Sequence, residues 1–500
     1  MASLTEIAEG ILANAKRLDE YTASKGLRYS TFEKDTLSNL PDDFEDCRKS
    51  LVDSTQELKQ LAHGPVGLLL ETLFLFNDLL SLRFIYHYNI PQYVPADGSI
   101  SYADIARASK LDEALLRRFI QAAMVNRVFS EPQINYVQHT AISRLLKEDP
   151  EAMDAVGFLL EDLAPASTKV LAAFEKWPGS GEPNETGFNI ENDTGDPFYL
   201  ELAKTPERSR RFGGGMRFMT RGSLYDIGHL INGYDWAALD KADGLVVDIG
   251  GGHGGVSRAL ATSTIKLQLI VQDLPGTVKE GESLLPENLK GRVKFMPHDF
   301  FTEQPVKGAD VYFFRFILHN WSDSYCTKIL KNLLPAMKNG SKVVIYEFLI
   351  SEMANTAWSQ KQGRNLDMIG ATGWNSLERT TSDWENLFAS VDPRYRFLGA
   401  RTPENSSVSL IEAGGEQTRS YGHQNGKEED DWSVVAILSG TSSRNAEAKD
   451  LAEDERQTSD SRAGSRGSSD GLKPFGDAVG CSRRRERRRR PRRFQSTCRP

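Results

Sequence analysis

The stretch LVVDIGGGHGG, residues 245–255, decides the fold of this chain. A short apolar run leads directly into a glycine-rich turn, and a helical pattern over residues 256–261 follows the turn. Glycine lets the backbone turn tightly and approach a ligand closely. A strand, a glycine-rich turn and a helix in this order are typical of the first crossover of a doubly wound α/β sheet.

The segments downstream of this turn repeat the strand pattern. Apolar runs alternate with amphipathic stretches as far as residue 413, and these runs are LQLIVQDL, VKFMPHDF, ADVYFFRFIL and KVVIYEFLI. Such alternation predicts a doubly wound, Rossmann-like sheet whose ligands bind at the carboxyl ends of its strands. We therefore expect an α/β domain over residues 161–413, in which linking helices precede the sheet.

Residues 1–160 show helical periodicity and predict a separate, all-helical domain. The stretch from Ser101 to Asp104 resembles a capping box, residues 115–124 mark the apolar face of a second helix, and strand-like pieces flank Pro132. This order predicts a winged helix. Because its exposed positions mix acidic and basic side chains, we interpret it as a packing and dimerisation module and not as a DNA reader. These positions are Asp112, Glu113, Arg117 and Arg118.

The composition argues against several classes of protein. The 500 residues are 39% hydrophobic and carry a formal net charge of -8, without the basic footprint that nucleic-acid binding requires. The most apolar stretch, residues 67–88, contains Glu71, Asp78 and Arg83, so it predicts a buried helix and not a membrane span. The N-terminal segment lacks the pattern of a signal peptide, and we expect a cytoplasmic protein.

The cysteines and histidines show no metal-binding pattern. The 4 cysteines are scattered without CxxC or Cys/His spacing, and the 8 histidines are dispersed. This indicates neither a zinc site nor a disulfide framework, and we predict a mechanism without a metal.

Residues 414–500 are polar and poor in aromatic side chains, which predicts a disordered, low-complexity tail. Its last part, residues 481–494, holds 9 arginines. Such a run is compatible with a nuclear-localisation signal or a nucleic-acid patch, but we favour a solvated tail without a catalytic role.

The glycine-rich turn leaves two cofactors open. Gly250, Gly252 and Gly255 satisfy the dinucleotide fingerprint GxGxxG, so the glycines alone do not separate NAD from S-adenosylmethionine. Asp248 precedes the first glycine, and a carboxylate there suits a positively charged amino acid moiety better than a pyrophosphate. Asp273 ends the second apolar run, where a carboxylate can bind both ribose hydroxyls of either cofactor.

The segment FRFILHNWSD, residues 314–323, completes a set of motifs that belong together. With VVDIGGGHGG, VQDLPGTV, PHDFF, IYEFLI and LERTTSDWENLF, it resembles the plant caffeic-acid-type O-methyltransferases and their fungal secondary-metabolite relatives. The resemblance covers most of residues 1–413. It implies an S-adenosylmethionine-dependent O-methyltransferase that methylates a phenolic hydroxyl of a small aromatic molecule. It also implies a homodimer in which the N-terminal helices exchange across a two-fold axis.

The same resemblance assigns the catalytic residues. His319 matches the family's general base, and Glu347 and Glu378 match two carboxylates that hold its second ring nitrogen. The chemistry agrees, because an imidazole with a pKa of about 6.5 can accept the proton of a phenol, whose pKa is about 10. Many relatives carry an aspartate where this chain has Asn320, so a charge beside the histidine is absent here.

Binding residues follow from the resemblance in the same way. The cofactor would be held by Asp248, Gly250, Gly251, Gly252 and Asp273, with Asp299 and Phe300 flanking the adenine and Arg315 near the cofactor's carboxylate. Soft apolar side chains suit a flat aromatic acceptor. The family's acceptor pocket maps to Met216, Phe218, Met219, Met368 and Trp374.

Two other functions are compatible with parts of the sequence. An NAD-dependent oxidoreductase would use the same glycine-rich turn, but no Tyr-x-x-x-Lys pair follows it, and His319 would have no task. A catalytically silent winged-helix regulator would combine the N-terminal domain with the arginine-rich tail, and the intact His319 argues against it.

Overall fold

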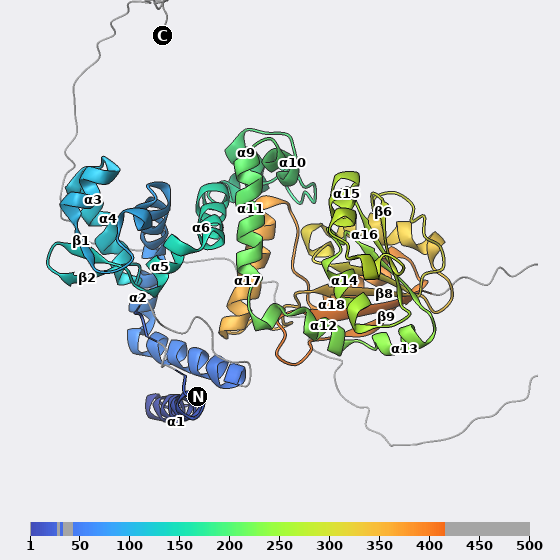
Figure 1. The fold of residues 1–500 in the computed structure, drawn as a ribbon, viewed down its shortest axis with the longest axis horizontal. Helices are drawn as coiled ribbons and strands as arrows, with labels where there is room; N and C mark the ends of the chain where they lie inside the picture. Colours follow the sequence, from blue (N-terminus) through green and yellow to red (C-terminus); the bar gives the residue numbers. More distant parts are fainter. Residues whose placement is uncertain (1, 28–30, 34–43, 416–500) are drawn as a thin grey trace, which may run out of the picture. The chain divides into compact units, whose positions relative to one another are not determined.

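The strand pattern in the second half of the chain builds a seven-stranded sheet (Figure 1). The computed structural model describes residues 2–27, 31–33 and 44–415, and these belong to one compact unit. The tail predicted for residues 414–500 lies outside the described residues except at Gly414 and Gly415, which belong to the last strand and so extend the domain beyond the expected boundary. The strands are β4 (Leu245–Ile249), β5 (Gln268–Asp273), β6 (Val293–Pro297), β7 (Val311–Arg315), β8 (Lys342–Glu347), β9 (Tyr395–Arg401) and β10 (Ser409–Gly415).

The strand order is β6-β5-β4-β7-β8-β10-β9, which confirms the predicted Rossmann-like fold. The strands β4 to β8 are parallel, whereas β10 is antiparallel to both β8 and β9. The direction of winding reverses at β4, which lies between β5 and β7. The carboxyl ends of these strands therefore border the crevice where ligands bind in doubly wound sheets.

Helices cover both faces of this sheet. Val246 and Val247 are neighbours in β4, yet they belong to different buried clusters, because successive residues of a strand point to opposite faces. The cluster of Val247 includes residues of α16 (Asp323–Leu333) and α18 (Thr381–Val391). The cluster of Val246 includes residues of α12 (Ile227–Gly233), α13 (Trp236–Lys241) and α14 (Gly255–Ser263). Burial on both faces explains why the strands are almost continuous apolar runs.

The N-terminal part is mostly helical but contains a small antiparallel sheet, so the expectation of an all-helical domain was incomplete. The sheet has the order β1-β3-β2. Its side chains pack with those of the flanking helices in one buried cluster. The elements are α1 (Leu4–Ser24), α2 (Glu45–His87), η2 (Ile90–Tyr93), β1 (Ser99–Ser101), α3 (Tyr102–Ser109), α4 (Glu113–Val125), β2 (Ser130–Gln133), β3 (Tyr136–Gln138), α5 (Ala141–Glu148) and α6 (Pro150–Gly157).

The predicted capping box at the start of α3 forms only in part. The Ser101 hydroxyl accepts a hydrogen bond from the Asp104 N–H at 3.1 Å, as an N-cap should. The Asp104 carboxylate does not return to the Ser101 backbone and instead accepts from the Ser101 hydroxyl at 2.7 Å.

The apolar stretch 67–88 forms the second half of α2, and the prediction that it is buried is confirmed only at its end, where Phe84 and Ile85 join the N-terminal cluster. The helix kinks at Gly64, whose φ of 63° lies in the left-handed region, just before Pro65. Beyond the kink a stripe of large apolar side chains remains exposed, which includes Leu69, Leu73, Phe76 and Leu80. No described helix is long and apolar enough to cross a membrane.

The segment between the two sheets is helical, and shorter helices also flank the strands of the large sheet. Residues from this segment form a fourth buried cluster around Phe158 and Phe198, and Ile369 of α17 packs against it. The elements are η3 (Phe158–Leu163, a π-helix), α7 (Ala164–Ser167), α8 (Val170–Lys176), α9 (Gly187–Asn192), α10 (Phe198–Ala203), α11 (Pro206–Met219), η4 (Ser223–Tyr225), α15 (Pro275–Ser283), η5 (Glu287–Leu289), η6 (Leu318–Asn320), η7 (Leu334–Ala336) and α17 (Trp358–Gly373).

Candidate active site

The glycine-rich turn joins β4 to α14 and requires glycine for two different reasons. Gly250 and Gly252 have φ values of 68° and 58°, which side chains other than glycine rarely adopt. Gly251 has no such strain, but a Cβ there would lie 2.7 Å from Cγ of Asp248. The turn is fixed to β5, because the N–H of Gly252 donates to Oδ2 of Asp273 at 2.9 Å. The backbone of the turn can therefore approach a ligand at the carboxyl ends of β4 and β5.

Two carboxylates border this turn. Asp248 is 2% exposed and accepts a hydrogen bond from the Ser257 hydroxyl at 2.7 Å. Burial raises the pKa of Asp248 to about 6, although Ser257 and the charge of Arg315 oppose the rise. Asp273 ends β5, and each of its oxygens accepts one backbone N–H, from Gly252 and from Leu274. A carboxylate offers about four acceptor positions, so Asp273 keeps capacity for hydroxyl donors.

Arg315 ends β7 and carries a buried donor without a partner. Its Nε makes no hydrogen bond with any described residue, and its guanidinium lies 4.7 Å from the centre of the Phe316 ring. Burial lowers the pKa of Arg315, and the neighbouring Tyr346 and Asp248 oppose this shift. Because a buried donor without an acceptor is unfavourable, the Nε of Arg315 is suited to bind an anionic or carbonyl oxygen of a ligand.

Asp299 and Phe300 lie in the turn after β6. Oδ1 of Asp299 accepts the N–H of Phe301 at 3.0 Å, which fixes the turn. The Phe300 ring meets the Trp321 ring edge-on at 6.1 Å between centres. The turn after β6 is thus in contact with the segment that follows β7.

The segment from Phe316 to Asp323, which we call the His319 turn, leaves β7 with an unusual backbone. Phe316 has a φ of 54°, a left-handed conformation that a bulky residue rarely adopts. The next two N–H groups, of Ile317 and Leu318, both donate to Oε1 of Glu347, at 2.8 and 2.6 Å. Glu347 therefore holds the backbone of this turn, and it makes no hydrogen bond to the imidazole that the sequence assigned to it.

His319 is held by the other predicted carboxylate. Its Nδ1 lies 2.9 Å from Oε1 of Glu378, and its side chain is 20% exposed. Burial by itself opposes the charged imidazolium, but the hydrogen bond to Glu378 and the charges of Glu378 and Glu347 outweigh it and raise the pKa of His319. The rings of Phe316 and Phe348 lie 5.6 and 6.5 Å from the imidazole. One oxygen of each glutamate stays buried without a partner among the described residues.

The predicted acceptor residues separate into two groups. Met216, Met219 and Trp374 pack against the buried cluster of Phe158 and Phe198. Met368 does not join them, because its side chain is 61% exposed on α17. Phe218 points elsewhere too, since it packs against the N-terminal cluster.

Two residues of this site escaped the sequence analysis. Tyr199, in α10, donates its hydroxyl to Oδ1 of Asn320 at 3.1 Å, and its ring lies 6.0 Å from that of Trp374. Asn320 also donates from Nδ2 to the carbonyl of Phe316 at 3.0 Å. The second missed residue is Arg379, which follows Glu378. Neither residue carries a local sequence signal, because their partners are distant in the chain.

These features define a class of protein. A glycine-rich turn with two carboxylates at the reversal point of a parallel sheet is a cofactor site, and a histidine held by a glutamate beside it can act as a base. The chain is thus an α/β enzyme that binds a nucleoside-containing cofactor.

Comparison with known proteins identifies the family. Residues 195–391 match the O-methyltransferase domain family. The chlorophenol O-methyltransferase of Trichoderma longibrachiatum is 36% identical over 415 residues, which are 81% of this chain and 89% of that protein. The grayanic acid biosynthesis cluster O-methyltransferase of Cladonia grayi is 34% identical over 420 residues, 83% of this chain and 88% of that protein. The crystal structure of OxaC in complex with SAH and oxaline shares the fold, with a TM-score of 0.64 and 21% identity over 82% of this chain and 98% of that one.

The chain therefore belongs to the fungal secondary-metabolite family of S-adenosylmethionine-dependent O-methyltransferases. S-adenosylmethionine is the cofactor of this family, and the residues present fit it. The buried Nε of Arg315 has no acceptor among the described residues, and the space beside Gly252 is open, because a Cβ there would meet nothing within 4 Å.

Proposed function

We propose that this enzyme methylates a phenolic hydroxyl of a small aromatic metabolite and that His319 is its general base. The contact between Nδ1 of His319 and Oε1 of Glu378 carries the proposal. A carboxylate at Nδ1 fixes the tautomer in which Nε2 has a free lone pair, and it stabilises the imidazolium that forms when Nε2 takes a proton. The chlorophenol O-methyltransferase named above, by its name, acts on a phenol, which supports a phenolic acceptor here.

In this mechanism the protein holds the acceptor and moves one proton. S-adenosylmethionine supplies, when bound, an electrophilic methyl group on a positively charged sulfur. Nε2 of His319 accepts the proton of the acceptor hydroxyl as the oxygen becomes nucleophilic. Glu378 keeps the imidazole oriented, and Phe316 and Phe348 flank the ring and limit access of water.

The cofactor would be held at the carboxyl ends of β4, β5, β6 and β7. Asp248 suits the cofactor's ammonium group, because a buried carboxylate with a single side-chain donor gains from a cation. Asp273 would accept the ribose hydroxyls, and Arg315 would donate to the carboxylate. Asp299 and Phe300 would border the adenine, and Gly250, Gly251 and Gly252 would give it backbone access.

The acceptor pocket would lie along the cluster of Met216, Met219 and Trp374, which is rich in aromatic rings. Aromatic and thioether side chains favour a flat aromatic ligand. Met368 is left out of this pocket, because its side chain is exposed.

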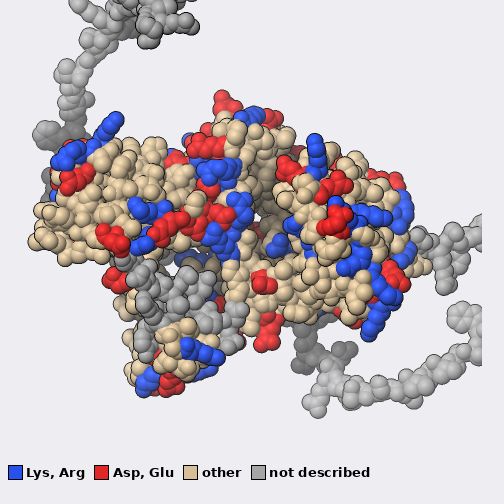
Figure 2. Space-filling model, viewed as in Figure 1, with Lys and Arg blue, Asp and Glu red and all other residues tan. Residues whose placement is uncertain are grey.

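We also infer that the N-terminal part serves dimerisation and not nucleic-acid binding. Arg117 lies on α4, the second helix of the proposed winged helix, and its guanidinium covers the Tyr102 ring at 4.3 Å and pairs with Glu113 at 2.9 Å. Acidic and basic residues are interspersed on the face shown in Figure 2. The exposed apolar stripe of α2 supports a homodimer, because apolar patches of this kind mark protein contacts.

Methyl transfer to simple phenols tests the function. Wild-type protein is expected to form methylated products from S-adenosylmethionine, detected by mass spectrometry, and His319→Gln should lower kcat by roughly 100- to 10,000-fold. Calorimetry should show binding of S-adenosylmethionine by both proteins and no binding of NAD. A His319→Gln variant with wild-type kcat would exclude the general base, and binding of NAD in place of S-adenosylmethionine would restore the oxidoreductase alternative.

A further inference from the structure

The His319 turn needs support at both ends. It starts at Phe316, whose left-handed backbone is strained, and such strain persists only when the surroundings hold it. Glu347 holds the N–H groups at the start of the turn. The carbonyls of Leu318 and Trp321 lie on either side of His319, and a carboxylate cannot donate to them. The Leu318 carbonyl accepts the N–H of Trp321 at 3.1 Å, and the Cys326 thiol lies 3.3 and 3.5 Å from the two oxygens, so each oxygen keeps capacity for stronger donors.

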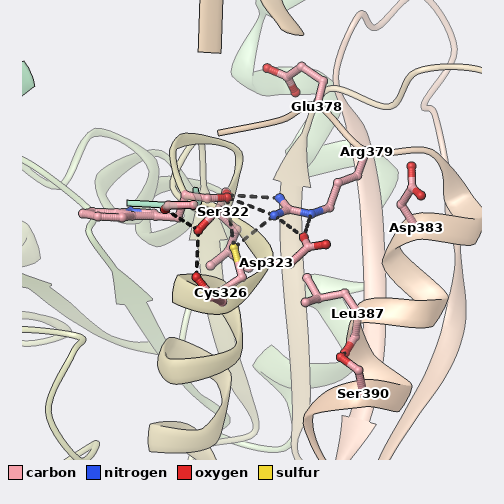
Figure 3. Close-up of polar contacts among 12 residues, drawn as sticks. Ser322, Asp323, Cys326, Glu378, Arg379, Asp383, Leu387 and Ser390 are labelled. Atoms are coloured by element: carbon pink, nitrogen blue, oxygen red, sulfur yellow. Dashed lines mark hydrogen bonds and ion pairs between the residues drawn. The ribbon is translucent and has the colours of Figure 1, made fainter. Parts of the chain in front are cut away.

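Arg379 supplies these donors (Figure 3). Its Nη1 donates to the carbonyl of Leu318 at 3.1 Å, and its Nη2 donates to the carbonyl of Trp321 at 2.9 Å. The same guanidinium contacts Oδ1 of Asp323 from Nε at 3.0 Å and from Nη2 at 2.8 Å. It also lies 3.3 Å from Sγ of Cys326, at the start of α16.

Burial of the Arg379 guanidinium is unfavourable unless its charge and its donors have partners. Its side chain is 0% exposed, whereas that of its ionic partner Asp323 is 64% exposed. A buried cation is tolerated only when it is paired and its donors are satisfied. Most of the N–H donors of Arg379 bind acceptors in the His319 turn. Stabilisation of the core alone would be served equally well by an apolar side chain of similar volume.

Arg379 directly follows Glu378, the residue that orients the proposed base. Glu378 contacts the imidazole of His319, and Arg379 contacts the carbonyls that precede and follow this residue. The segment is fixed to the residues that follow β8, because the N–H of Ile350 donates to the carbonyl of Arg379 at 3.2 Å. Two neighbouring side chains therefore hold the ring of His319 and the backbone on either side of this residue.

We infer that Arg379 is a positioning residue for the catalytic base: its planar fork fixes the two carbonyls that flank His319 and so sets the place of the imidazole. The inference rests on the proposed role of His319. A small displacement is enough to matter, because a shift of about 1 Å at a catalytic group can lower the rate by roughly 100-fold.

Steady-state kinetics of Arg379→Met and Arg379→Lys test the inference in the full chain. Arg379→Met is expected to lower kcat by roughly 10- to 100-fold, while the KM for S-adenosylmethionine stays within about twofold. Arg379→Lys keeps the charge but has a single donor centre, so it should restore only part of the loss. If Arg379→Met does not fold, the lysine variant alone must still show a reduced kcat with unchanged KM.

Tyr395→Phe provides a matched control for loss of a buried polar contact. The Tyr395 hydroxyl is buried and donates to the carbonyl of Leu330 at 2.7 Å, away from the His319 turn. This variant should lower the melting temperature and keep wild-type kcat. Arg379→Lys with wild-type kcat, or Arg379→Met with no greater loss of kcat than Tyr395→Phe, would overturn the inference. A fully active His319→Gln would instead overturn the proposed function on which it rests.

Discussion

Among the described residues, His319 has one side-chain hydrogen-bond partner, Glu378, and under the proposed mechanism this contact should set how the activity depends on pH. Glu378 and Glu347 raise the pKa of His319 above its ordinary value of about 6.5, even though burial acts in the opposite direction. A base must be neutral to accept a proton. Activity should therefore be lost as the pH falls through this raised pKa and should level off above it.

Glu378→Gln removes the charge but keeps a hydrogen-bonding side chain of the same size. The pKa of His319 should fall, so the acid limb of the profile of kcat against pH should move to lower pH. The plateau should drop by roughly 10- to 100-fold, because the imidazolium loses its counter-charge. Glu385→Gln, at an exposed position on α18, is the control and should leave both unchanged. An unshifted acid limb in Glu378→Gln would contradict the assignment of this limb to His319.

Asn320 replaces a common aspartate, and its contacts indicate what the amide contributes. Nδ2 donates to the carbonyl of Phe316, the residue with the strained backbone, and Oδ1 accepts from Tyr199. Asn320→Asp keeps the acceptor but replaces the donor with an oxygen that repels the Phe316 carbonyl. We expect kcat to fall by roughly 3- to 10-fold, in line with the loss of one hydrogen bond near the base.

Tyr199→Phe separates the two contacts of Asn320. It removes only the hydroxyl that donates to Oδ1 and leaves the bond to Phe316 in place. Its effect on kcat, measured with the same phenol, should be smaller than that of Asn320→Asp. Equal losses of kcat in the two variants would show that the hydrogen bond from Nδ2 of Asn320 to the Phe316 carbonyl does not contribute to the rate.

The proposed base and the two glutamates near it were identified in the sequence through the motifs that resemble the family, but their contacts were not. Glu378 contacts the imidazole of His319, whereas Glu347 holds the backbone N–H groups that precede it. Arg379 acts on Leu318, 61 residues away, and Tyr199 acts on Asn320, 121 residues away. A buried arginine and a tyrosine on a short helix have no periodicity or spacing that reveals such distant partners.

At the scale of elements, the strands that are buried on both faces of the sheet were the ones that the sequence predicted most clearly. The strands β4, β5, β7 and β8 have few exposed residues, so their apolar runs stand out in the sequence. In the edge strand β9 (YRFLGAR) only the first residue is buried, and the pairing with β10 includes a bulge, so the strand lacks a clear apolar pattern. In the small N-terminal sheet, β2 and β3 match the strand-like pieces predicted around Pro132, whereas β1, with three residues, is too short to stand out from the helical periodicity around it.

The close packing of α11 against α6 depends on consecutive glycines that differ in their surroundings. A Cβ at Gly214 would lie 2.1 Å from Oδ2 of Asp154, a buried carboxylate paired with Arg210. A Cβ at Gly213 would meet only the end of the Arg217 side chain at 3.5 Å. Gly214→Ala should therefore lower the free energy of unfolding by about 1–3 kcal/mol.

Gly213→Ala is the matched substitution one residue away. It should raise the free energy of unfolding by about 0.5–1 kcal/mol, because alanine favours the helix and nothing obstructs its methyl group. Urea denaturation of both variants measures the difference. Equal effects at the two positions would mean that α11 does not depend on close approach to Asp154.

At the scale of the whole molecule, the exposed apolar stripe of α2 is the feature that one chain leaves unexplained. Leu69, Leu73, Phe76 and Leu80 recur at spacings of four, three and four residues, so they share one face of the helix, and each is 47–63% exposed. Such a stripe fits a second copy of the same helix, which would bury it symmetrically. Sedimentation velocity at micromolar concentration should show a dimer.

Leu73→Glu combined with Phe76→Glu should convert this dimer to a monomer, because burying two carboxylates in an apolar contact is unfavourable. Ile265→Glu is the control: this residue is 82% exposed and lies outside α2, so its substitution should leave the dimer intact. The melting temperature of the wild type should rise with protein concentration, and that of the double variant should not, because only association makes stability depend on concentration. A wild type that sediments as a monomer, or a double variant that stays dimeric, would mean that this stripe is covered by something other than a second copy.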